Sequence, residues 1–510
     1  MDNTGAASAF GLLRLPNEVL LEIFQYLDPA DPGIFGISTS CKRLHYLALP
    51  IFLSAWIPDA ALPASRDLVL SPNQLEVLVP LQTSLFIHSL RNLSCSFSLN
   101  SARRDYSSRD MDIFFRNIRR LAGFLSILQR VDEVTLDFKD LNFWAIGESL
   151  DALETWSSVI SALLDVVLEK DCRTLNVEGG MFIVHSSQFQ RKPGPRATVQ
   201  RRSVMFDVGR RISSAFVARP DVQKVTPDPG KPRVGLRTFN IHSRVLLLHP
   251  CYTWTMAALN TSPNLLSLSI VRVDIPERSW DEILSSIHVP TLEDLSIDLR
   301  CRIRAASFDQ FLARHPRIYN LNLGRDLLPL PENDAASKDC LPNLRNLSAS
   351  ASYVRFLMVD KRAPAVRALR LLVKVASHAI FKVADINYML APCHARMGGI
   401  HLTLAITVDY ASSHWTGFFP DEDSTAAPKR RVPDSLRSAQ ALELVSTCAS
   451  DAFENLALRW LPSFPLLRSV SFSGCLNKHL DPVSFVFRVR EACPDIELVT
   501  IDGKRFDAVP

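Results

Sequence analysis

Near its N-terminus the chain shows a helical period of apolar residues. Between Pro16 and Leu27, apolar positions recur at i, i+1, i+4, i+5 and i+8, which predicts a helix of about three turns with one apolar face. Pro16 suits the first helical turn, and Glu18 lies near the positive end of the helix dipole. The segment 28–32, DPADP, is predicted to end this helix.

A second helical stretch is predicted through Cys41 and Leu44, ending at Pro50. Between the two stretches, Gly33 and Gly36 disfavour a regular helix. Two or three short helices in so few residues bury little surface by themselves. Exposed apolar side chains on such a module indicate that another chain covers them.

These residues resemble the F-box family. Leu15–Leu20 (LPNEVL) is similar to its opening signature, Ile23–Leu27 (IFQYL) to its first helix, and Cys41–Leu44 (CKRL) to a later element. The resemblance implies a small helical bundle that docks on a Skp-type adaptor, and through it on cullin and RING subunits. The residues that it implies for adaptor binding are Leu15, Pro16, Val19, Leu20, Ile23 and Leu44. Each of them either forms the docking face or holds the bundle together.

The other interpretation of the module is an amphipathic hairpin that caps the downstream domain.

The rest of the chain contains an internal repeat. Seven segments begin with proline and place apolar residues two and five positions later, with an apolar or small residue at position seven. The first five prolines are 27, 26, 26 and 22 residues apart, a spacing typical of leucine-rich repeats. The segments begin at Pro263, Pro290, Pro316, Pro342, Pro364, Pro465 and Pro494.

Each repeat has the pattern of a helix, a proline break and a short strand. Side chains alternate along a strand, so positions five and seven face a common core and position six faces outward. Helix-like segments precede several prolines, at 279–289, 307–315 and 481–493. Stacked units of this kind form one continuous core. The predicted fold is therefore α/β: a small helical bundle followed by a leucine-rich-repeat-like solenoid with a parallel sheet. This resembles the substrate-binding part of divergent, fungal-type F-box proteins, although another solenoid type remains open.

The repeat pattern also indicates the domain organisation. Looser copies occur upstream of Pro263, between residues 90 and 241, so the predicted domains are 10–57 and an irregular repeat domain at 75–510. Segments 186–235 and 411–438 interrupt the repeats with proline and charged residues and are predicted to be mobile insertions.

Composition and charge limit the kinds of partner and the location that we expect for this chain. The net charge of +4 over 510 residues predicts no nucleic-acid binding. No apolar run approaches the roughly 18 residues of a membrane span, and the N-terminus lacks a secretory pattern. Ten scattered cysteines in such a chain are expected to be reduced, which favours the cytoplasm, the nucleus or both.

No catalytic, metal-binding or cofactor-binding motif is found. The sequence lacks a Cys-x-x-Cys pair, a phosphate-binding glycine loop, a Gly-x-Ser-x-Gly elbow and a His-Glu-x-x-His helix. We therefore expect no cofactor and no enzymatic activity. The outward strand positions carry small polar residues, which suit a protein surface better than a cofactor pocket. The predicted target-binding residues are Ser269, Asp294, Ser296, Asp298, Asn320, Asn322, Asn346 and Arg370.

The resemblance implies a substrate-recognition subunit of a Skp–cullin–F-box ubiquitin ligase. The bundle would bind the adaptor, and the repeats would hold an unknown protein target for ubiquitination and proteasomal degradation. Three alternatives remain open at this point. The chain is a Skp-binding protein acting outside a ligase, a repeat scaffold capped by its first helices, or an enzyme with a convergent site on the repeat face.

Overall fold

The structure is a computed structural model whose residues fall into two compact units. The first unit contains residues 1–238 and 243–264, and the second contains 239–242 and 265–510. The structure describes residues 14–57, 66–98, 108–140, 150–180, 235–248, 251–298, 301, 303–324, 340–359, 362–375, 390–391, 399–408, 437–446, 451–474, 476 and 481–507. The predicted insertions at 186–235 and 411–438 lie almost entirely outside the described residues.

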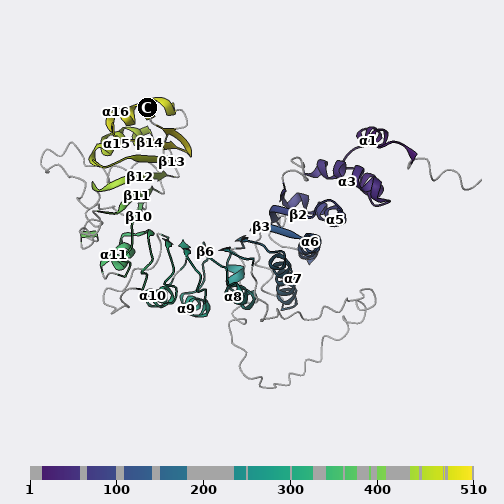
Figure 1. The fold of residues 1–510 in the computed structure, drawn as a ribbon, viewed down its shortest axis with the longest axis horizontal. Helices are drawn as coiled ribbons and strands as arrows, with labels where there is room; N and C mark the ends of the chain where they lie inside the picture. The colour runs from purple at the N-terminus through teal and green to yellow at the C-terminus, as the bar shows by residue number, and fades with distance from the viewer. Residues whose placement is uncertain are drawn as a thin grey trace, which may run out of the picture. The chain divides into compact units, whose positions relative to one another are not determined.

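The N-terminal module is a bundle of three helices, α1 (Asn17–Gln25), α2 (Pro32–Ser38) and α3 (Lys42–Trp56) (Figure 1). The predicted first helix is confirmed: it begins after Pro16 and ends before segment 28–32. Six buried residues from all three helices form one apolar core. They are Leu20, Phe24, Ile34, Leu44, Ala48 and Phe52.

Two local predictions for this bundle are wrong. The glycine-containing segment forms helix α2, because Asp31 caps it by accepting the Gly33 backbone N–H at 2.7 Å and because Ile34 enters the core. Helix α3 does not end at Pro50 but continues to Trp56. Burial of Phe52 beyond the proline favours continuation of the helix over the loss of one backbone hydrogen bond.

The remainder of the first unit alternates strands with helices. Strands β1 to β4 are hydrogen-bonded in sequence order, and each neighbouring pair is parallel. The sequence pattern marked strands here but no helices, whereas α6 and α7 are 20 residues long each. The elements are β1 (Asp67–Leu70), η2 (Pro72–Val77), α5 (Leu78–Thr83), β2 (Ser89–Ser98), α6 (Ser108–Ile127), β3 (Arg130–Asp140), α7 (Leu150–Glu169), β4 (Thr174–Gly179), η5 (Arg244–Leu247) and α8 (Tyr252–Thr261).

The second unit continues the same architecture. Its strands are again neighbours in sequence order, and every pair whose direction is recorded is parallel except the last, β14 with β15. Helices α9 and α10 contact each other on one side of the sheet (Figure 1). The elements are β5 (Thr238–His242), β6 (Ser267–Val271), α9 (Glu277–Ser286), β7 (Asp294–Asp298), α10 (Ala305–Arg314), β8 (Asn320–Leu323), β9 (Asn346–Ser350), α11 (Ala351–Val359), β10 (Ala368–Val375), β11 (His401–Val408), β12 (Ala439–Ser446), α15 (Asp451–Trp460), η8 (Leu461–Ser463), β13 (Ser469–Ser473), α16 (Pro482–Ala492), β14 (Leu498–Ile501) and β15 (Lys504–Asp507).

Equivalent repeat positions stand in register across these strands. Leu268 pairs with Leu295, which pairs with Leu321, and Leu321 with Leu347. All four side chains are buried, as predicted for position five of the repeat. The predicted helices before the proline breaks are also present, as α9, α10 and α16. The α/β fold class, a helical bundle followed by parallel helix–strand units, is confirmed.

A buried histidine joins two successive repeats. The Val289 backbone N–H donates to Nε2 of His315 at 3.2 Å, while Nδ1 lies 2.7 Å from the Phe311 carbonyl oxygen. Nε2 therefore accepts and Nδ1 carries the proton. Burial lowers the pKa of His315, which keeps the ring neutral and suited to this pair of hydrogen bonds.

Candidate functional site

Helix α1 has apolar residues on two sides. Leu20 and Phe24 are fully buried in the bundle core, whereas Val19, Ile23 and Leu27 are 38%, 37% and 37% exposed. We call Val19 and Ile23, together with Leu27 two residues beyond the end of the helix, the outer face of α1. Contiguous exposed apolar side chains on a small module indicate a surface that a partner covers.

The six predicted adaptor-binding residues separate into two groups. Pro16, Val19 and Ile23 are exposed, and Leu15 is half-buried against the edge of the core. Leu20 and Leu44 are buried inside the bundle. These two residues therefore support the docking surface that the sequence predicts and do not form it directly.

The bundle contacts the first repeat through α3. His45 Nε2 accepts the Leu85 backbone N–H at 3.1 Å, and its Nδ1 lies 3.1 Å from the Ser38 carbonyl oxygen. The Gln74 side chain donates to the Trp56 carbonyl oxygen at 2.5 Å. These contacts join α3 to the repeats and leave the outer face of α1 exposed among the described residues.

The second candidate site is the side of the second unit's sheet opposite the repeat core, which we call the open face. Two rows of polar side chains cross it, one residue from each strand. The first row consists of Ser267, Asp294, Asn320 and Asn346, and the second of Ser269, Ser296, Asn322, Ser348 and Arg370. Seven of the eight predicted target-binding residues lie in these rows. The eighth, Asp298, ends β7, and its side chain lies outside the described residues.

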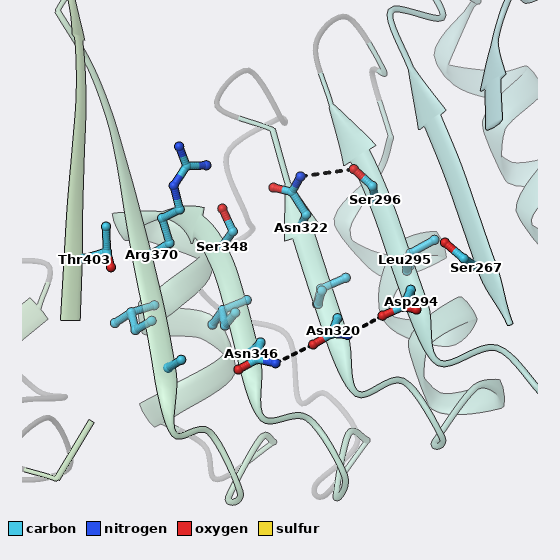
Figure 2. Close-up of a pocket in the computed structure, with 14 residues that line it drawn as sticks. Ser267, Asp294, Leu295, Ser296, Asn320, Asn322, Asn346, Ser348, Arg370 and Thr403 are labelled. Carbon is cyan, nitrogen blue, oxygen red and sulfur yellow. Dashed lines mark hydrogen bonds between the residues drawn. The ribbon is translucent and has the colours of Figure 1, made fainter. Parts of the chain in front are cut away.

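Hydrogen bonds join some neighbouring members of the rows (Figure 2). In the first row the Asn320 amide donates to the Asp294 carboxylate, and the Asn346 amide donates to Asn320 Oδ1 at 2.5 Å. In the second row the Asn322 amide donates to Ser296 Oγ at 3.1 Å. The structure thus brings three predicted residues from successive repeats, Asp294, Asn320 and Asn346, into one hydrogen-bonded row.

These rows line a hollow of about 360 Å³. Its walls include the members of both rows except Ser269, together with Thr403 of β11 (Figure 2). The volume lies at the lower end of the range for small-molecule pockets, a size that suits one or two side chains. Ser348 Oγ is buried in the wall and, among the described residues, has no hydrogen-bond partner.

The C-terminal side of the hollow ends at an ion pair. Arg370 Nε lies 3.1 and 3.0 Å from the two carboxylate oxygens of Glu443, and a second guanidinium nitrogen also contacts this carboxylate. The sequence predicted Arg370 but missed Glu443 and Thr403. Their strands, β12 and β11, lack the leading proline of the repeat. The alternating pattern of residues 401–408, HLTLAITV, was the signal available for β11.

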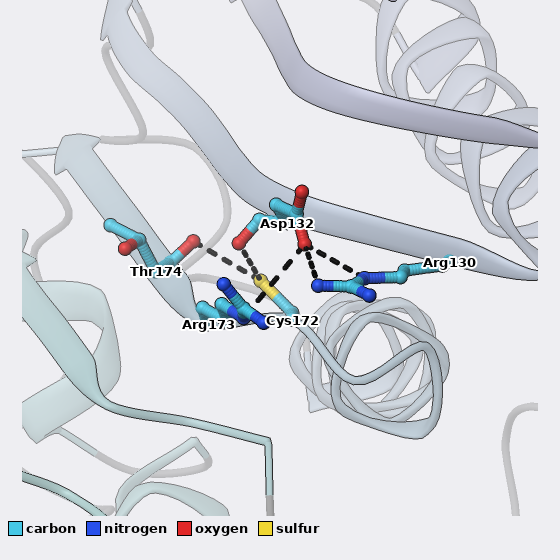
Figure 3. Close-up of polar contacts among 5 residues, drawn as sticks. All are labelled: Arg130, Asp132, Cys172, Arg173 and Thr174. Atoms are coloured by element: carbon cyan, nitrogen blue, oxygen red, sulfur yellow. Dashed lines mark hydrogen bonds and ion pairs between the residues drawn. The ribbon is translucent and has the colours of Figure 1, made fainter.

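A third polar cluster lies in the first unit, where the Asp132 carboxylate accepts from Arg130 at 2.7 Å and lies 4.0 Å from Arg173 (Figure 3). The neighbouring Cys172 thiol contacts the Asp132 and Thr174 carbonyl oxygens. Burial raises the pKa of Cys172 to about 12, so this thiol is protonated at neutral pH and is a poor nucleophile.

Two features are absent from the described part of the chain. No group of three or more His, Cys, Asp or Glu side chains is arranged there to hold a metal ion. No helix in it combines the length and apolarity that crossing a membrane requires.

A three-helix module followed by parallel helix–strand units defines the class: an α/β protein with leucine-rich-repeat-like architecture. The sequence model of the F-box-like family matches residues 12–53. The N-terminal bundle is therefore an F-box-like domain, as the sequence resemblance implied.

Comparisons of the whole chain are less specific. No curated protein matches it. The structure titled as the complex of Rad7 and Elc1 in yeast aligns with 10% identity and a TM-score of 0.34, over 96% of each chain. The leucine-rich repeat-containing protein LegL7 from Legionella pneumophila aligns with 12% identity and a TM-score of 0.34, over 84% of this chain and 97% of that chain. Scores this low carry no argument, so the fold assignment rests on the strand order and register described above.

Proposed function

We propose that this protein is the substrate-recognition subunit of a Skp–cullin–F-box ubiquitin ligase. In this proposal the outer face of α1 docks on a Skp-type adaptor, and the open face of the repeat sheet holds the protein to be ubiquitinated. The chain itself performs no chemistry. It raises the effective concentration of the target beside the conjugating enzyme that the RING subunit recruits.

One observation carries the adaptor half of the proposal. Val19 and Ile23 of α1, and Leu27 just beyond its end, are each more than a third exposed, although the other apolar side of this helix is fully buried. A module that only caps the repeats would bury this face against them. Instead the repeats contact α3, through His45 and Trp56.

The target half of the proposal is supported by the open face. It is a broad polar sheet with a shallow hollow, and such surfaces suit a polypeptide partner. The described residues offer no metal cluster, and the described thiols whose pKa departs from its ordinary value are all shifted upward, mainly by burial. This favours a binding role over an enzyme on the repeat face.

The adaptor proposal is tested by two substitutions that add the same charge to α1. Ile23→Asp places a carboxylate on the outer face, whereas Gln25→Asp places one at an exposed polar position of the same helix. We expect affinity-purified wild type and Gln25→Asp proteins to contain a Skp-type adaptor and a cullin. Ile23→Asp should lose both and keep its other partners.

The same experiment separates the proposal from its nearest alternative. An adaptor that co-purifies with wild type in the absence of any cullin would support a Skp-binding protein acting outside a ligase. If Ile23→Asp retains the adaptor as well as wild type does, the outer face of α1 is not the docking surface.

A further inference from the structure

We propose that the hollow on the open face recognises a basic side chain, lysine or arginine, in an extended segment of the target. This inference rests on the proposed function, because it names the chemistry that the target must present. The groups that carry it are the Asp294 carboxylate and the asparagines that follow it on β8 and β9.

The direction of hydrogen bonding from Asp294 to Asn346 in the first row is fixed by Asp294. An ionised carboxylate only accepts hydrogen bonds, so Asn320 must turn its NH₂ group toward Asp294. Its carbonyl oxygen then faces β9, and Asn346 must offer an NH₂ group in turn. The carbonyl oxygen of Asn346 points onward, beside Ala368, which has no polar side-chain atom. Asp294 and Asn346 therefore both present acceptor oxygens.

The charges around the hollow favour a cation at Asp294. Its lining contains two formal charges, those of Asp294 and Arg370. The Glu443 carboxylate holds the Arg370 guanidinium in a two-oxygen ion pair, so the charges of Arg370 and Glu443 offset each other. No basic side chain of the described residues forms an ion pair with Asp294, and its only recorded donor is the neutral Asn320 amide. Asp294 is thus the charge in the hollow without a counter-ion.

The charged residues that precede the strands do not offset Asp294. Glu293 precedes β7 and is exposed, but it is not part of the lining of the hollow. Arg345, which precedes Asn346 two strands from Asp294, is placed over the Tyr319 ring at 5.1 Å from its centroid. A lysine or arginine entering beside Asp294 gains a charge-assisted hydrogen bond in a partly buried site.

Strand spacing sets the length of the bound segment. Neighbouring strands are about 4.8 Å apart, so the Asp294 and Asn346 side chains, two strands apart, are separated by roughly 10 Å. An extended chain covers this distance in about three residues. The basic residue would bind Asp294, and a donor group about three residues away would meet the exposed Asn346 side chain.

The test uses the full chain purified with its Skp-type adaptor and four short peptides. Each peptide is a glycine–serine sequence with one central residue: arginine, lysine, citrulline or glutamate. Citrulline keeps the shape of arginine and removes the charge. Saturation-transfer NMR, which detects weak binding, reports the contact and its dissociation constant. We expect the arginine and lysine peptides to bind, and the citrulline and glutamate peptides to bind at least about tenfold more weakly.

Two matched variants locate the contact. Asp294→Asn removes the charge but keeps an oxygen that accepts from Asn320, so the row survives. Glu293→Gln removes an equal charge one residue away. We expect Asp294→Asn to lower the affinity for the arginine peptide about tenfold or more, and Glu293→Gln to leave this affinity within about twofold of the wild-type value. Equal losses in the two variants, equal binding of citrulline, or no binding to wild type would each overturn the inference.

Failure of this inference is distinguishable from failure of the proposed function. Adaptor binding depends on α1, so Asp294→Asn should co-purify with the adaptor at the wild-type level. If the adaptor is retained and no basic peptide binds, the ligase proposal stands and the recognition chemistry is wrong. If no adaptor co-purifies with the wild-type chain but basic peptides bind, the hollow recognises basic segments in a protein that is not a subunit of this ligase.

Discussion

Substitution of Leu20 and of Ile23 by alanine should separate bundle stability from adaptor docking, although the two residues are less than one helical turn apart. Leu20 is fully buried, so Leu20→Ala removes core contacts and leaves a cavity, at a cost of about 2–5 kcal/mol. Ile23 is 37% exposed, and its exposed part corresponds to about 0.6–1.1 kcal/mol of the roughly 1.5–3 kcal/mol gained by full burial. Ile23→Ala should therefore weaken adaptor binding about three- to sixfold.

Replacing the whole outer face increases the effect. Val19, Ile23 and Leu27 have nearly equal exposure, so the triple alanine variant should lose about 2–3 kcal/mol of binding free energy, or 30- to 150-fold in affinity. Adaptor affinity can be measured by biolayer interferometry, and bundle stability by hydrogen exchange of residues 17–56. The reasoning is refuted if Ile23→Ala lowers protection across the bundle as much as Leu20→Ala, or if the triple variant binds the adaptor like wild type.

Three further predictions concern the repeats. Burial lowers the pKa of His315 from its ordinary value of 6.5, so the unfolded chain binds the proton more readily than the folded chain. As the pH is lowered below about 6.5, the unfolding free energy should therefore fall more steeply in wild type than in His315→Gln. Urea titrations at several pH values would measure this difference. Gly474 and Gly503 both have positive φ, but of these two only Gly474 has a neighbour that an added Cβ would meet, the Ser446 carbonyl oxygen. In thermal melts Gly474→Ala should therefore lose more stability than Gly503→Ala, for which the φ strain alone costs about 1–2 kcal/mol. Equal losses in the two variants would contradict the clash. Cys172, with its pKa raised to about 12, should resist iodoacetamide in the folded protein at neutral pH and react after denaturation; rapid modification of the native protein, measured by mass spectrometry, would contradict its burial.

Within the repeats, local patterns were sufficient to predict the strands that follow a leading proline and which of their side chains face the core. Alternation along a strand determines which side chains share a face, so Leu295 and Ile297 were assigned to the core and are buried. The same alternation placed Asp294 and Ser296 on the outward side, where the structure has them. These features depend on a few adjacent residues and on backbone geometry alone.

Local rules failed where burial opposes them. The two glycines of α2 and Pro50 of α3 disfavour a helix, yet both segments are helical because Ile34 and Phe52 pack into the bundle core. The cost of about 1 kcal/mol for a glycine is smaller than the roughly 1.5–3 kcal/mol gained by burying a large apolar side chain. The cost of about 3 kcal/mol for Pro50 is offset by burying two such side chains beyond it, Phe52 and Leu53. Tertiary packing therefore decides such segments.

By itself the sequence determined the start of the first helix, the spacing of the repeats and the set of outward residues. Only the tertiary structure decided that Asp294, Asn320 and Asn346 form one hydrogen-bonded row, and that Arg370 pairs with Glu443, 73 residues away. It also decided that α3 contacts the repeats and leaves the outer face of α1 exposed. The physical reason is the same in each case: these contacts join segments far apart in the chain, and their register depends on how the repeats stack, which no local period of apolar residues encodes.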